Sequence, residues 1–383
     1  MFDLLVVPVE VESYIPQKTQ SFLQKPFWAE FKKRNGWSCG MFNVSGKIQG
    51  CEFEPFTLTV LLKEISVFGF IAYVPLGPNI FFDKDFSNEE TAKTAGKFLS
   101  ELSEKLKSLL PKNVFCIRFD PPWKTEVLNS KGKKACNEQF PKLSILKNAS
   151  KKILKAKYDV QPPDSVHLDL TVSDSELEAD LKSKWRYNIR LANKKGVEIK
   201  RLTGEDAKTT GVDIFYKLYT ETAKRDGIAI HSKAYYESLL SLAQNSSSKY
   251  NTEVAVYLAI HEGDYLAGII VISADTQAVY LYGASSNKKR NLMSTYALQW
   301  QAICDAKKNG AEQYDFYGIP PLDEPSHPMY GLYRFKTGFG GKIVHFVGSL
   351  DVELKPLSYK MYSIAENLRS TWYKRLKKLL KRV

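Results

Sequence analysis

The stretch RNLMSTYALQWQAICDAKKNGAEQYDFYGIPP, residues 290–321, decides the fold because it joins a helical pattern directly to a strand-like one. The apolar positions at helical spacing are Ala297, Leu298, Ile303 and Ala306. Ser294 is the expected N-cap of this helix, and Gly310 lies just past its expected end. The strand-like EQYDFYGIPP follows at once, so the stretch predicts a helix that leads into a strand.

The same unit occurs earlier in the chain. NEETAKTAGKFLSELSEKLKSLL (88–110) has helical spacing and is followed by the strand-like NVFCIRFDPPW. Both strands end on a proline pair, Pro121–Pro122 and Pro320–Pro321. In the second copy, EVAVYLAI and YLAGIIVIS flank a turn at Gly263 and predict a hairpin. The order of helices, antiparallel meander, helix and strand is that of N-acyltransferase folds. We therefore predict an α/β (α+β) protein of two tandem GNAT-like domains.

Length and composition agree with a two-domain globular protein. The chain has 383 residues, of which 44% are hydrophobic and 25% charged. Its first residues, MFDLLVVPVEVESYIP, are too short to span a bilayer and lack the basic start of a signal peptide, so we expect a cytoplasmic protein. The net charge of +13 favours a polyanionic partner: nucleic acid, anionic lipid or a phosphorylated substrate.

Several kinds of active site have no signal in this sequence. The five cysteines form no C-x-x-C pair and lie far from the five histidines, which argues against a metal site or a disulfide framework. No elbow motif accompanies a serine or cysteine nucleophile. The stretch SSNKKRNLMS (285–294) has no glycine for the pyrophosphate of coenzyme A. We expect no cofactor and no metal. Lys288 and Arg290 in this stretch are candidate phosphate contacts, and the alternative is a solvated charge run.

The 290–321 stretch, followed by GLYRFKTGFGGK (331–342), closely resembles the Fem family of peptidoglycan bridge-forming aminoacyltransferases. Four more stretches occur in family order and extend the resemblance over most of the chain: FLQKPFWAEFKKRNGW, IRFDPPW, KWRYNIRLANKKGVEI and ETAKRDGIAIHSKAYY. The resemblance implies an enzyme that moves an amino acid (Gly, Ser or Ala) from aminoacyl-tRNA to the stem-peptide amine of a UDP- or lipid-linked muropeptide. The alternatives are an aminoacyl-tRNA-protein transferase, a CoA-dependent N-acyltransferase and a non-catalytic tRNA- or membrane-binding protein.

The resemblance also implies a catalytic group in the motif FKTGFGG. Lys336 would neutralise the oxyanion that develops on the ester, an effect worth about 3 to 4 kcal/mol, while Phe335 would pack against the terminal adenine. Gly338 and Gly340 would let the backbone approach the tRNA closely. The alternative is a glycine-rich hairpin whose lysine is solvated.

Four residues are implied for the muropeptide. Lys32 and Arg225 occupy the family's diphosphate-binding positions, and Asp120 and Tyr282 would line the same cleft. Each residue has a structural alternative. Lys32 can be part of a solvated basic helix end, and Arg225 can form a surface ion pair with Asp226. Asp120 can cap a turn, and Tyr282 can belong to a core.

The C-terminal sequence LRSTWYKRLKKLLKRV (368–383) predicts a basic amphipathic helix, suited to tRNA or to peripheral contact with an anionic membrane. The alternative is a helix packed on the body. No charged heptad segment is long enough for the helical arm of some family members. We expect a monomer with a discontinuous first domain, 1–160 plus 347–383, that binds the precursor, and a second domain, 161–346, on the tRNA side.

Overall fold

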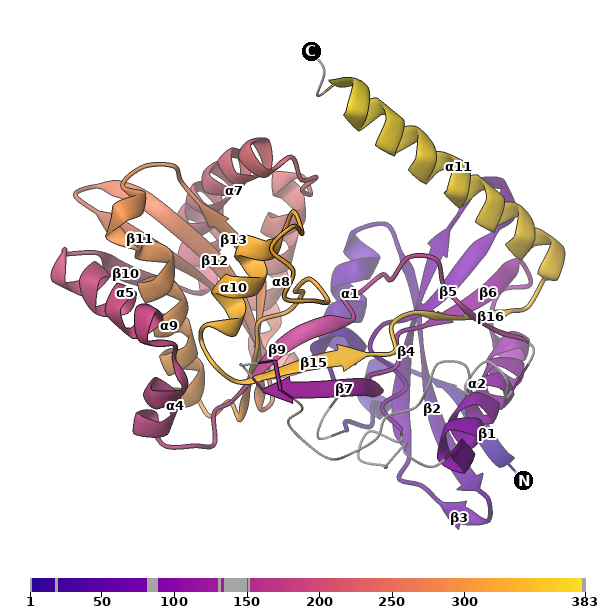
Figure 1. Cartoon of the computed structure of the whole chain (residues 1–383). Helices are drawn as coiled ribbons and strands as arrows, with labels where there is room; N and C mark the ends of the chain where they lie inside the picture. The colour runs from indigo at the N-terminus through magenta and orange to yellow at the C-terminus, as the bar shows by residue number, and fades with distance from the viewer. Residues whose placement is uncertain are drawn as a thin grey trace.

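The computed structural model describes residues 2–17, 20–80, 89–129, 132–133, 150 and 152–380. Within these ranges the chain forms two mixed β-sheets with helices on their faces, side by side in one molecule (Figure 1). The predicted α/β class is confirmed.

The first sheet begins with an antiparallel meander and ends with strands that come from later parts of the chain. Its strand order is β1-β2-β4-β5-β6-β16-β8, with the short β3 paired to β2. These strands are β1 (Phe2–Val9), β2 (Ser38–Ile48), β3 (Cys51–Glu52), β4 (Phe56–Glu64), β5 (Phe70–Val74), β6 (Val114–Phe119), β8 (Ile153–Lys155) and β16 (Leu350–Glu353).

The second sheet repeats this plan. Its order is β10-β11-β12-β13-β14-β9-β15-β7. Its strands are β7 (Lys124–Asn129), β9 (Asp164–Asp169), β10 (Glu198–Leu202), β11 (Thr252–His261), β12 (Asp264–Ala274), β13 (Gln277–Ser285), β14 (Gln313–Asp315) and β15 (Lys342–Phe346).

The unit predicted twice from sequence is present in both sheets. Helix α2 (Glu89–Leu109) connects the parallel pair β5 and β6, and α9 (Ser294–Lys308) connects the parallel pair β13 and β14. One detail of the prediction is wrong. Ser294 is the first helical residue and not the cap, because the left-handed conformation of Met293, with φ of 55°, already turns the chain into the helix.

The two sheets exchange strands. After β6 the chain crosses to the second sheet as β7, and after β15 it returns to the first sheet as β16. The expected division into 1–160 plus 347–383 and 161–346 stays a prediction. Strand β7, however, lies before residue 160 in sequence and pairs with β15 of the second sheet.

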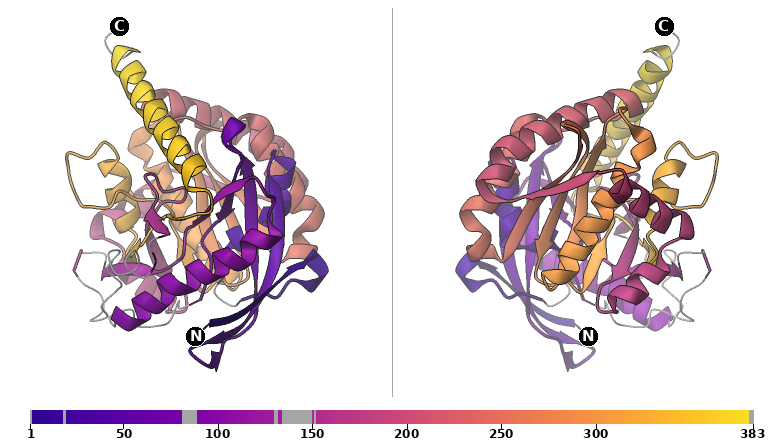
Figure 2. Two further views of the ribbon diagram at one scale, coloured as in Figure 1. Left: turned by 90° about the vertical axis from the view of Figure 1, so that its right-hand side faces the viewer. Right: turned by 90° about the vertical axis from the view of Figure 1, so that its left-hand side faces the viewer.

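Helices cover both faces of each sheet (Figure 2). They are α1 (Pro26–Arg34), α4 (Asp174–Asp180), α5 (Ser183–Lys194), α6 (Gly204–Asp206), α7 (Val212–Asp226), α8 (Lys233–Tyr250), α10 (Tyr330–Thr337) and α11 (Pro356–Leu380), besides α2 and α9. The apolar side chains of α2 and the first sheet form one hydrophobic core. Those of α5, α9 and one face of the second sheet form another.

A third core joins the two halves. Its side chains come from α1 and from β4 and β5 of the first sheet, and from α7, α8 and the central strands of the second sheet. Phe27, Phe31 and Tyr236 are fully buried there. Because this shared core is large and apolar, it fixes the position of one sheet relative to the other.

Among the residues that the structure describes, no helix is long and apolar enough to cross a membrane. The same residues contain no group of three His, Cys, Asp or Glu side chains that could hold a metal ion. Cys39, Cys51, Cys116 and Cys304 are free thiols.

A buried ion pair ties the returning strand β16 to the first sheet. Arg118 on β6 donates two hydrogen bonds of 2.7 Å to the carboxylate of Asp351 on β16. Both side chains are almost completely buried. A bidentate pair of this kind satisfies two charges that would otherwise be costly to bury.

We expect Asp351→Ala to lower the free energy of unfolding by about 3 to 5 kcal/mol, because it leaves the Arg118 guanidinium buried without its carboxylate. Urea denaturation of the purified protein measures this. The double variant Arg118→Met/Asp351→Leu removes both charges and should recover a large part of the loss. A loss below about 1 kcal/mol in the single variant would show that the pair does not hold the strand.

Candidate functional site

The parallel pairing between β13 and β14 ends after three residues. Gln277–Val279 pair with Gln313–Asp315, and no further pair follows. In the first sheet the equivalent strands stay paired up to Val74 and Phe119, and the N–H of Asp120 still donates to the Val74 carbonyl at 3.1 Å. The two strands therefore separate in the second sheet, while their counterparts remain joined in the first.

Lys336 supplies the hydrogen bonds that the separated strand lacks. Its ammonium donates to the carbonyls of Phe316 and Gly318, each at 2.8 Å, and to that of Tyr317 between them. The residue is only 6% exposed. An ammonium has three N–H groups, and here all three are used. The alternative, a glycine-rich hairpin with a solvated lysine, is wrong, because Lys336 lies in the last turn of α10 with its side chain inside the protein.

The buried surroundings of Lys336 shift its pKa. Burial lowers the pKa of Lys336 to about 7, and the nearby Asp315 carboxylate opposes this shift. The ammonium lies 5.1 Å from the centre of the Tyr280 ring. Since its N–H groups are all engaged, the lysine in its charged form acts on its surroundings through its electric field and not as a free hydrogen-bond donor.

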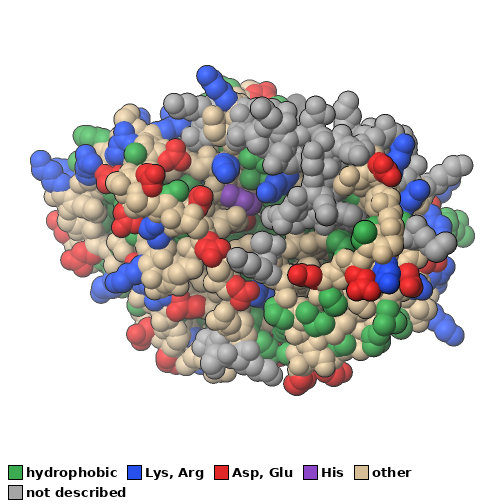
Figure 3. All heavy atoms as spheres, turned by 90° about the horizontal axis from the view of Figure 1, so that it is seen from below, with side chains coloured by type: hydrophobic (Ala, Val, Ile, Leu, Met, Phe, Trp, Pro, Cys, Tyr) green, Lys and Arg blue, Asp and Glu red, His purple; other side chains and the backbone are tan. Residues whose placement is uncertain are grey.

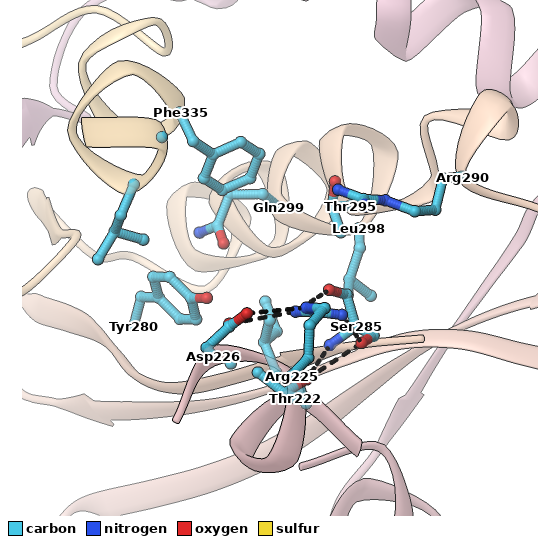
Figure 4. Close-up of a pocket in the computed structure, with 15 residues that line it drawn as sticks. Thr222, Arg225, Asp226, Tyr280, Ser285, Arg290, Thr295, Leu298, Gln299 and Phe335 are labelled. Carbon is cyan, nitrogen blue, oxygen red and sulfur yellow. Dashed lines mark hydrogen bonds and ion pairs between the residues drawn. The ribbon is translucent and has the colours of Figure 1, made fainter. Parts of the chain in front are cut away.

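A pocket of about 380 Å³ lies beside the part of β13 that no longer pairs with β14. Its walls come from β13, from the C-terminal end of α7, from the start of α9 and from α10. Phe335 and Tyr280 lie toward one end, and Arg225 and Arg290 lie toward the other (Figure 4). The pocket therefore offers aromatic faces at one end and cations at the other, the combination that a nucleotide requires.

Arg225 lines this pocket. It also forms the ion pair with Asp226 that the sequence analysis gave as the structural alternative to its binding role. Its guanidinium contacts Asp226 at 2.8 Å and donates to the Ser285 carbonyl at 2.8 Å (Figure 4). It also donates to Asn287 at 3.2 Å. These contacts hold the arginine against the end of β13. The structure thus brings Arg225 together with Arg290 and Phe335, not with Lys32.

Lys288 and the two glycines of the predicted tRNA side have local explanations. Lys288 is largely exposed and pairs with Asp264 at 2.8 Å. A side chain at Gly338 would have its Cβ within 2.1 Å of the Trp185 ring. Gly340 has a φ of +91°, and a Cβ there would lie 2.3 Å from the Asp180 carboxylate. Both glycines are thus required by packing of the FKTGFGG segment on its neighbours.

A cluster of tyrosines lies between the two sheets. It includes Tyr282, and the other two predicted residues, Lys32 and Asp120, contact it. We call the set Tyr73, Tyr235, Tyr236, Tyr282 and Tyr317 the interdomain tyrosine cluster. Lys32 of α1 reaches it, with its ammonium 3.2 Å from the hydroxyl of Tyr235 and 5.1 Å from the Trp28 ring. Burial lowers the pKa of Lys32 to about 8, and the charge of Lys63 adds to the shift.

Asp120 lies at the other end of the cluster, directly after β6. Its carboxylate accepts hydrogen bonds from the hydroxyls of Tyr73 and Ser349 and from the N–H of Gln161. Burial raises the pKa of Asp120, and these hydrogen bonds oppose the rise. The aspartate therefore does more than cap a turn, because it joins β5, β6 and two crossing segments of chain.

A β-bulge in β13 assigns neighbouring tyrosines to different sites. Ile270 of β12 pairs with Tyr282 and the next residue, Val271, pairs with Tyr280, so Leu281 is the extra residue. The two tyrosines consequently pack into different cores. Tyr280 lines the pocket, whereas Tyr282 packs on Tyr236 with ring centres 5.1 Å apart. Tyr282 is thus both a core aromatic and a member of the interdomain tyrosine cluster.

Tyr317 connects the pocket to the tyrosine cluster. Its main-chain carbonyl accepts from Lys336, and its hydroxyl donates to Gln161. It interacts electrostatically with both Asp120 and Tyr235. Its φ of 52° is a left-handed conformation that few residues other than glycine adopt, so the turn needs support from its surroundings. Lys336 provides that support through its hydrogen bond to the Tyr317 carbonyl.

Sequence reasoning missed His231, Tyr235 and Tyr317. His231 stacks on Tyr235, with ring centres 3.9 Å apart, and its pKa is lowered by burial and by the charge of Lys32. Tyr317 was overlooked as well. A signal for the first two was present, since HSKAYY (231–236) places a histidine and a tyrosine four residues apart at the start of a helix. Nothing in the sequence marks Tyr317, whose role depends on a turn formed by distant residues.

The FemAB family model matches the chain over residues 8–259 and 242–367. A lipid II:glycine glycyltransferase of Staphylococcus epidermidis is 24% identical to this chain, over 93% of the chain and 94% of that protein. A protein of the same name from Staphylococcus aureus is 24% identical over 88% of this chain and 89% of its own length. The crystal structure of FemX superimposes with a TM-score of 0.69 at 20% identity, covering 92% of this chain and 96% of FemX.

We expect Lys336→Met to lower the free energy of unfolding by about 2 to 4 kcal/mol, because it leaves the buried carbonyls of residues 316–318 without donors. Urea denaturation measures the loss. Lys288→Met is the matched control: it removes an exposed, paired lysine and should change stability by less than about 1 kcal/mol. Equal stability of the two variants would show that the turn does not need the ammonium.

Proposed function

Since this chain belongs to the FemAB family, we propose that it is an acyltransferase that attaches an amino acid to the stem-peptide amine of a peptidoglycan precursor. The similar lipid II:glycine glycyltransferases support a lipid-linked acceptor and the building of an interpeptide bridge. The observation that carries the proposal is the pocket at the β13–β14 separation, which has an aromatic end, an arginine end and a buried ammonium behind it.

We propose aminoacyl-tRNA as the donor, with its 3′ end in this pocket. Phe335 and Tyr280 would stack on the terminal adenine, and Arg225 and Arg290 would bind the neighbouring phosphate. The start of α9 contributes Thr295 to the same wall, so the helix N-terminus adds its partial positive charge. The equivalent region of the first sheet has no strand separation, which supports a single donor site in the second domain.

The proposed reaction needs no activation by the enzyme. The acceptor amine attacks the ester carbonyl of the aminoacyl group, a C–N bond forms, and the C–O bond to the ribose breaks. The amine loses a proton and the ribose oxygen gains one. Lys336 in its charged form would stabilise the intermediate oxyanion through its field: an oxyanion that came within about 5 Å of a unit charge at an effective dielectric of about 20 would gain about 3 kcal/mol.

We propose that the acceptor binds at the interdomain tyrosine cluster. Lys32 would contact the diphosphate, and His231, which is neutral near pH 7 because its pKa is lowered, would add a hydrogen-bond donor beside it. Asp120 at the far end of the cluster would receive the stem-peptide amine. Its raised pKa suits a group that takes up a proton as the amine attacks. Tyr282 would pack against the bound precursor.

We propose for Arg225 a role other than the expected diphosphate contact. Its position with Arg290 in the donor pocket supports a contact with the tRNA and not with the precursor diphosphate. Lys288 and the glycines 338 and 340 have packing or ion-pair partners of their own, so we give them no direct contact. The proposal includes a monomer that works in the cytoplasm, where aminoacyl-tRNA is present, and against the membrane that carries the acceptor.

We expect purified protein to transfer radiolabelled glycine, serine or alanine from charged tRNA to a muropeptide acceptor, with different defects in three variants. Arg225→Ala should raise KM for aminoacyl-tRNA about tenfold or more with little effect on KM for the acceptor, because only the donor loses a charged contact. Lys32→Ala should do the reverse. Lys336→Met should lower kcat by about 100-fold, the equivalent of about 3 kcal/mol.

The control for this experiment is Lys288→Ala, which should leave both KM values unchanged. Steady-state kinetics with each substrate varied in turn separates the effects. An Arg225→Ala defect confined to the acceptor would overturn the assignment of the pocket to tRNA. Absence of transfer to soluble and lipid-linked muropeptides alike, with folded protein, would reject the proposed reaction.

Acceptor binding should weaken as pH rises through about 8. The pKa of Lys32 is lowered to about 8, so its ammonium is present below that pH and is lost above it. A diphosphate then loses a charged contact, and KM for the acceptor should rise about tenfold or more between pH 7 and pH 9.5. Lys32→Arg, which stays charged over this range, should remove the dependence. The same pH profile in both proteins would contradict the role.

A further inference from the structure

One face of the C-terminal helix α11 is anchored to the first sheet. Tyr362 packs on Phe115 and Phe68, with ring centres 5.3 and 6.3 Å apart, and the hydroxyl of Tyr359 donates to the buried Asp351 at 2.8 Å. The contacts come from the strand β6, the strand β16 and the turn at residues 66–68. They fix the direction in which the helix leaves the protein body.

The opposite face of α11 is apolar and exposed. Leu357, Met361, Ile364 and Leu368 are 73%, 51%, 51% and 67% exposed. At about 100° per residue these four side chains fall within one narrow stripe, and that stripe lies about 160° from the mean direction of the two anchored tyrosines. Val67, which is 88% exposed, lies in the turn that packs against the helix. A row of exposed apolar side chains on a tethered helix is typical of a surface that binds something.

The helix continues past this stripe with many positive charges. Its backbone is helical to Leu380, and residues 369–383 contain seven Lys and Arg and no Asp or Glu. The sequence repeats apolar residues at Trp372, Leu376 and Leu379. The C-terminal part projects beyond the body (Figures 1 and 2), whereas acidic and basic side chains are interspersed on the lower face of the molecule (Figure 3).

We propose that α11 lies along an anionic membrane surface, with Leu357, Met361, Ile364 and Leu368 in the interface. An apolar stripe followed by a run of cations matches the acyl chains and anionic headgroups of such a surface. RNA would need the cations but not the stripe. A second copy of the chain would bring two sets of seven cations together, which is unfavourable.

The geometry suits this placement. A 25-residue helix is about 37 Å long and can lie in the plane of the interface while its tyrosine face stays bound to the protein. The inference rests on the proposed function only for the biological role of membrane binding, which would keep the enzyme at the surface that presents the lipid-linked acceptor. The binding itself is independent of catalysis and can be measured alone.

The test is co-sedimentation of the full chain with vesicles of phosphatidylcholine and phosphatidylglycerol (3:1) or of phosphatidylcholine alone. We expect at least about tenfold tighter partition onto the anionic vesicles and at least about tenfold weaker partition for Met361→Glu/Ile364→Glu. Both positions are exposed, so the double variant should keep the wild-type urea midpoint. Leu5→Glu, which changes an apolar residue that is 60% exposed on β1, is the matched control and should bind like the wild type.

The outcomes separate the alternatives. Equal vesicle binding by the wild type and Met361→Glu/Ile364→Glu overturns the proposal. A lower molar mass of the double variant than of the wild type in light scattering also overturns it, because it assigns the stripe to a second copy. A loss of tRNA binding in the double variant, without a loss of vesicle binding, overturns it as well, because it assigns the helix to RNA. If transfer occurs, the double variant should retain its rate with a soluble acceptor and lose rate with an acceptor in vesicles. If no transfer occurs but vesicle binding behaves as expected, only the proposed reaction fails.

Discussion

The carbonyls of Phe316, Tyr317 and Gly318 need hydrogen-bond donors after β14 has parted from β13. A buried carbonyl without a donor is costly, and on this side no strand is available to supply one. The ammonium of Lys336 donates to all three. This contact supports the chain where β14 has parted from β13. The pocket lies beside the unpaired end of β13, and the ammonium lies 5.1 Å from the centre of the Tyr280 ring that lines the pocket. The same ammonium thus serves folding and the proposed chemistry.

The comparison of the two halves shows why only one of them has this site. Both contain a meander followed by a parallel pair joined by a helix. In the first sheet the pair remains closed and its last residue leads to Asp120, which binds tyrosine and serine hydroxyls. In the second the pair opens and leads to Tyr317. Because the halves exchange strands and share an apolar core, the end of one pair and the opening of the other face a common region.

Sequence patterns were sufficient for the fold but not for the grouping of the site residues. Helical spacing and proline pairs predicted α2, α9 and the repeated unit, because these signals are local. The motif lysine was recognised, yet its burial was not, since the carbonyls it binds lie 18 to 20 residues away in sequence. Arg225 was grouped with Lys32 by resemblance. The position of Arg225 in the pocket depends on which way the end of α7 points, and no local pattern reports that. The bulge at Leu281, which divides Tyr280 from Tyr282, is equally invisible in sequence.

The charge of the chain illustrates the same distinction. A net charge of +13 suggests one broad basic surface, but the structure divides the cations by environment. Lys288 and Lys289, the obvious charge run, are largely matched by Glu262 and Asp264. Lys32 and Lys336, which look ordinary in sequence, are buried and have lowered pKa values of about 8 and 7. A charge in a desolvated site acts more strongly on a nearby anion than one in water. Lys32 and Lys336, the cations of the proposed reaction, are therefore the ones whose charged form burial disfavours most clearly. Lys32 contacts the interdomain tyrosine cluster at Tyr235, and Lys336 contacts it at Tyr317. Two cations placed in this way can serve two polyanionic substrates.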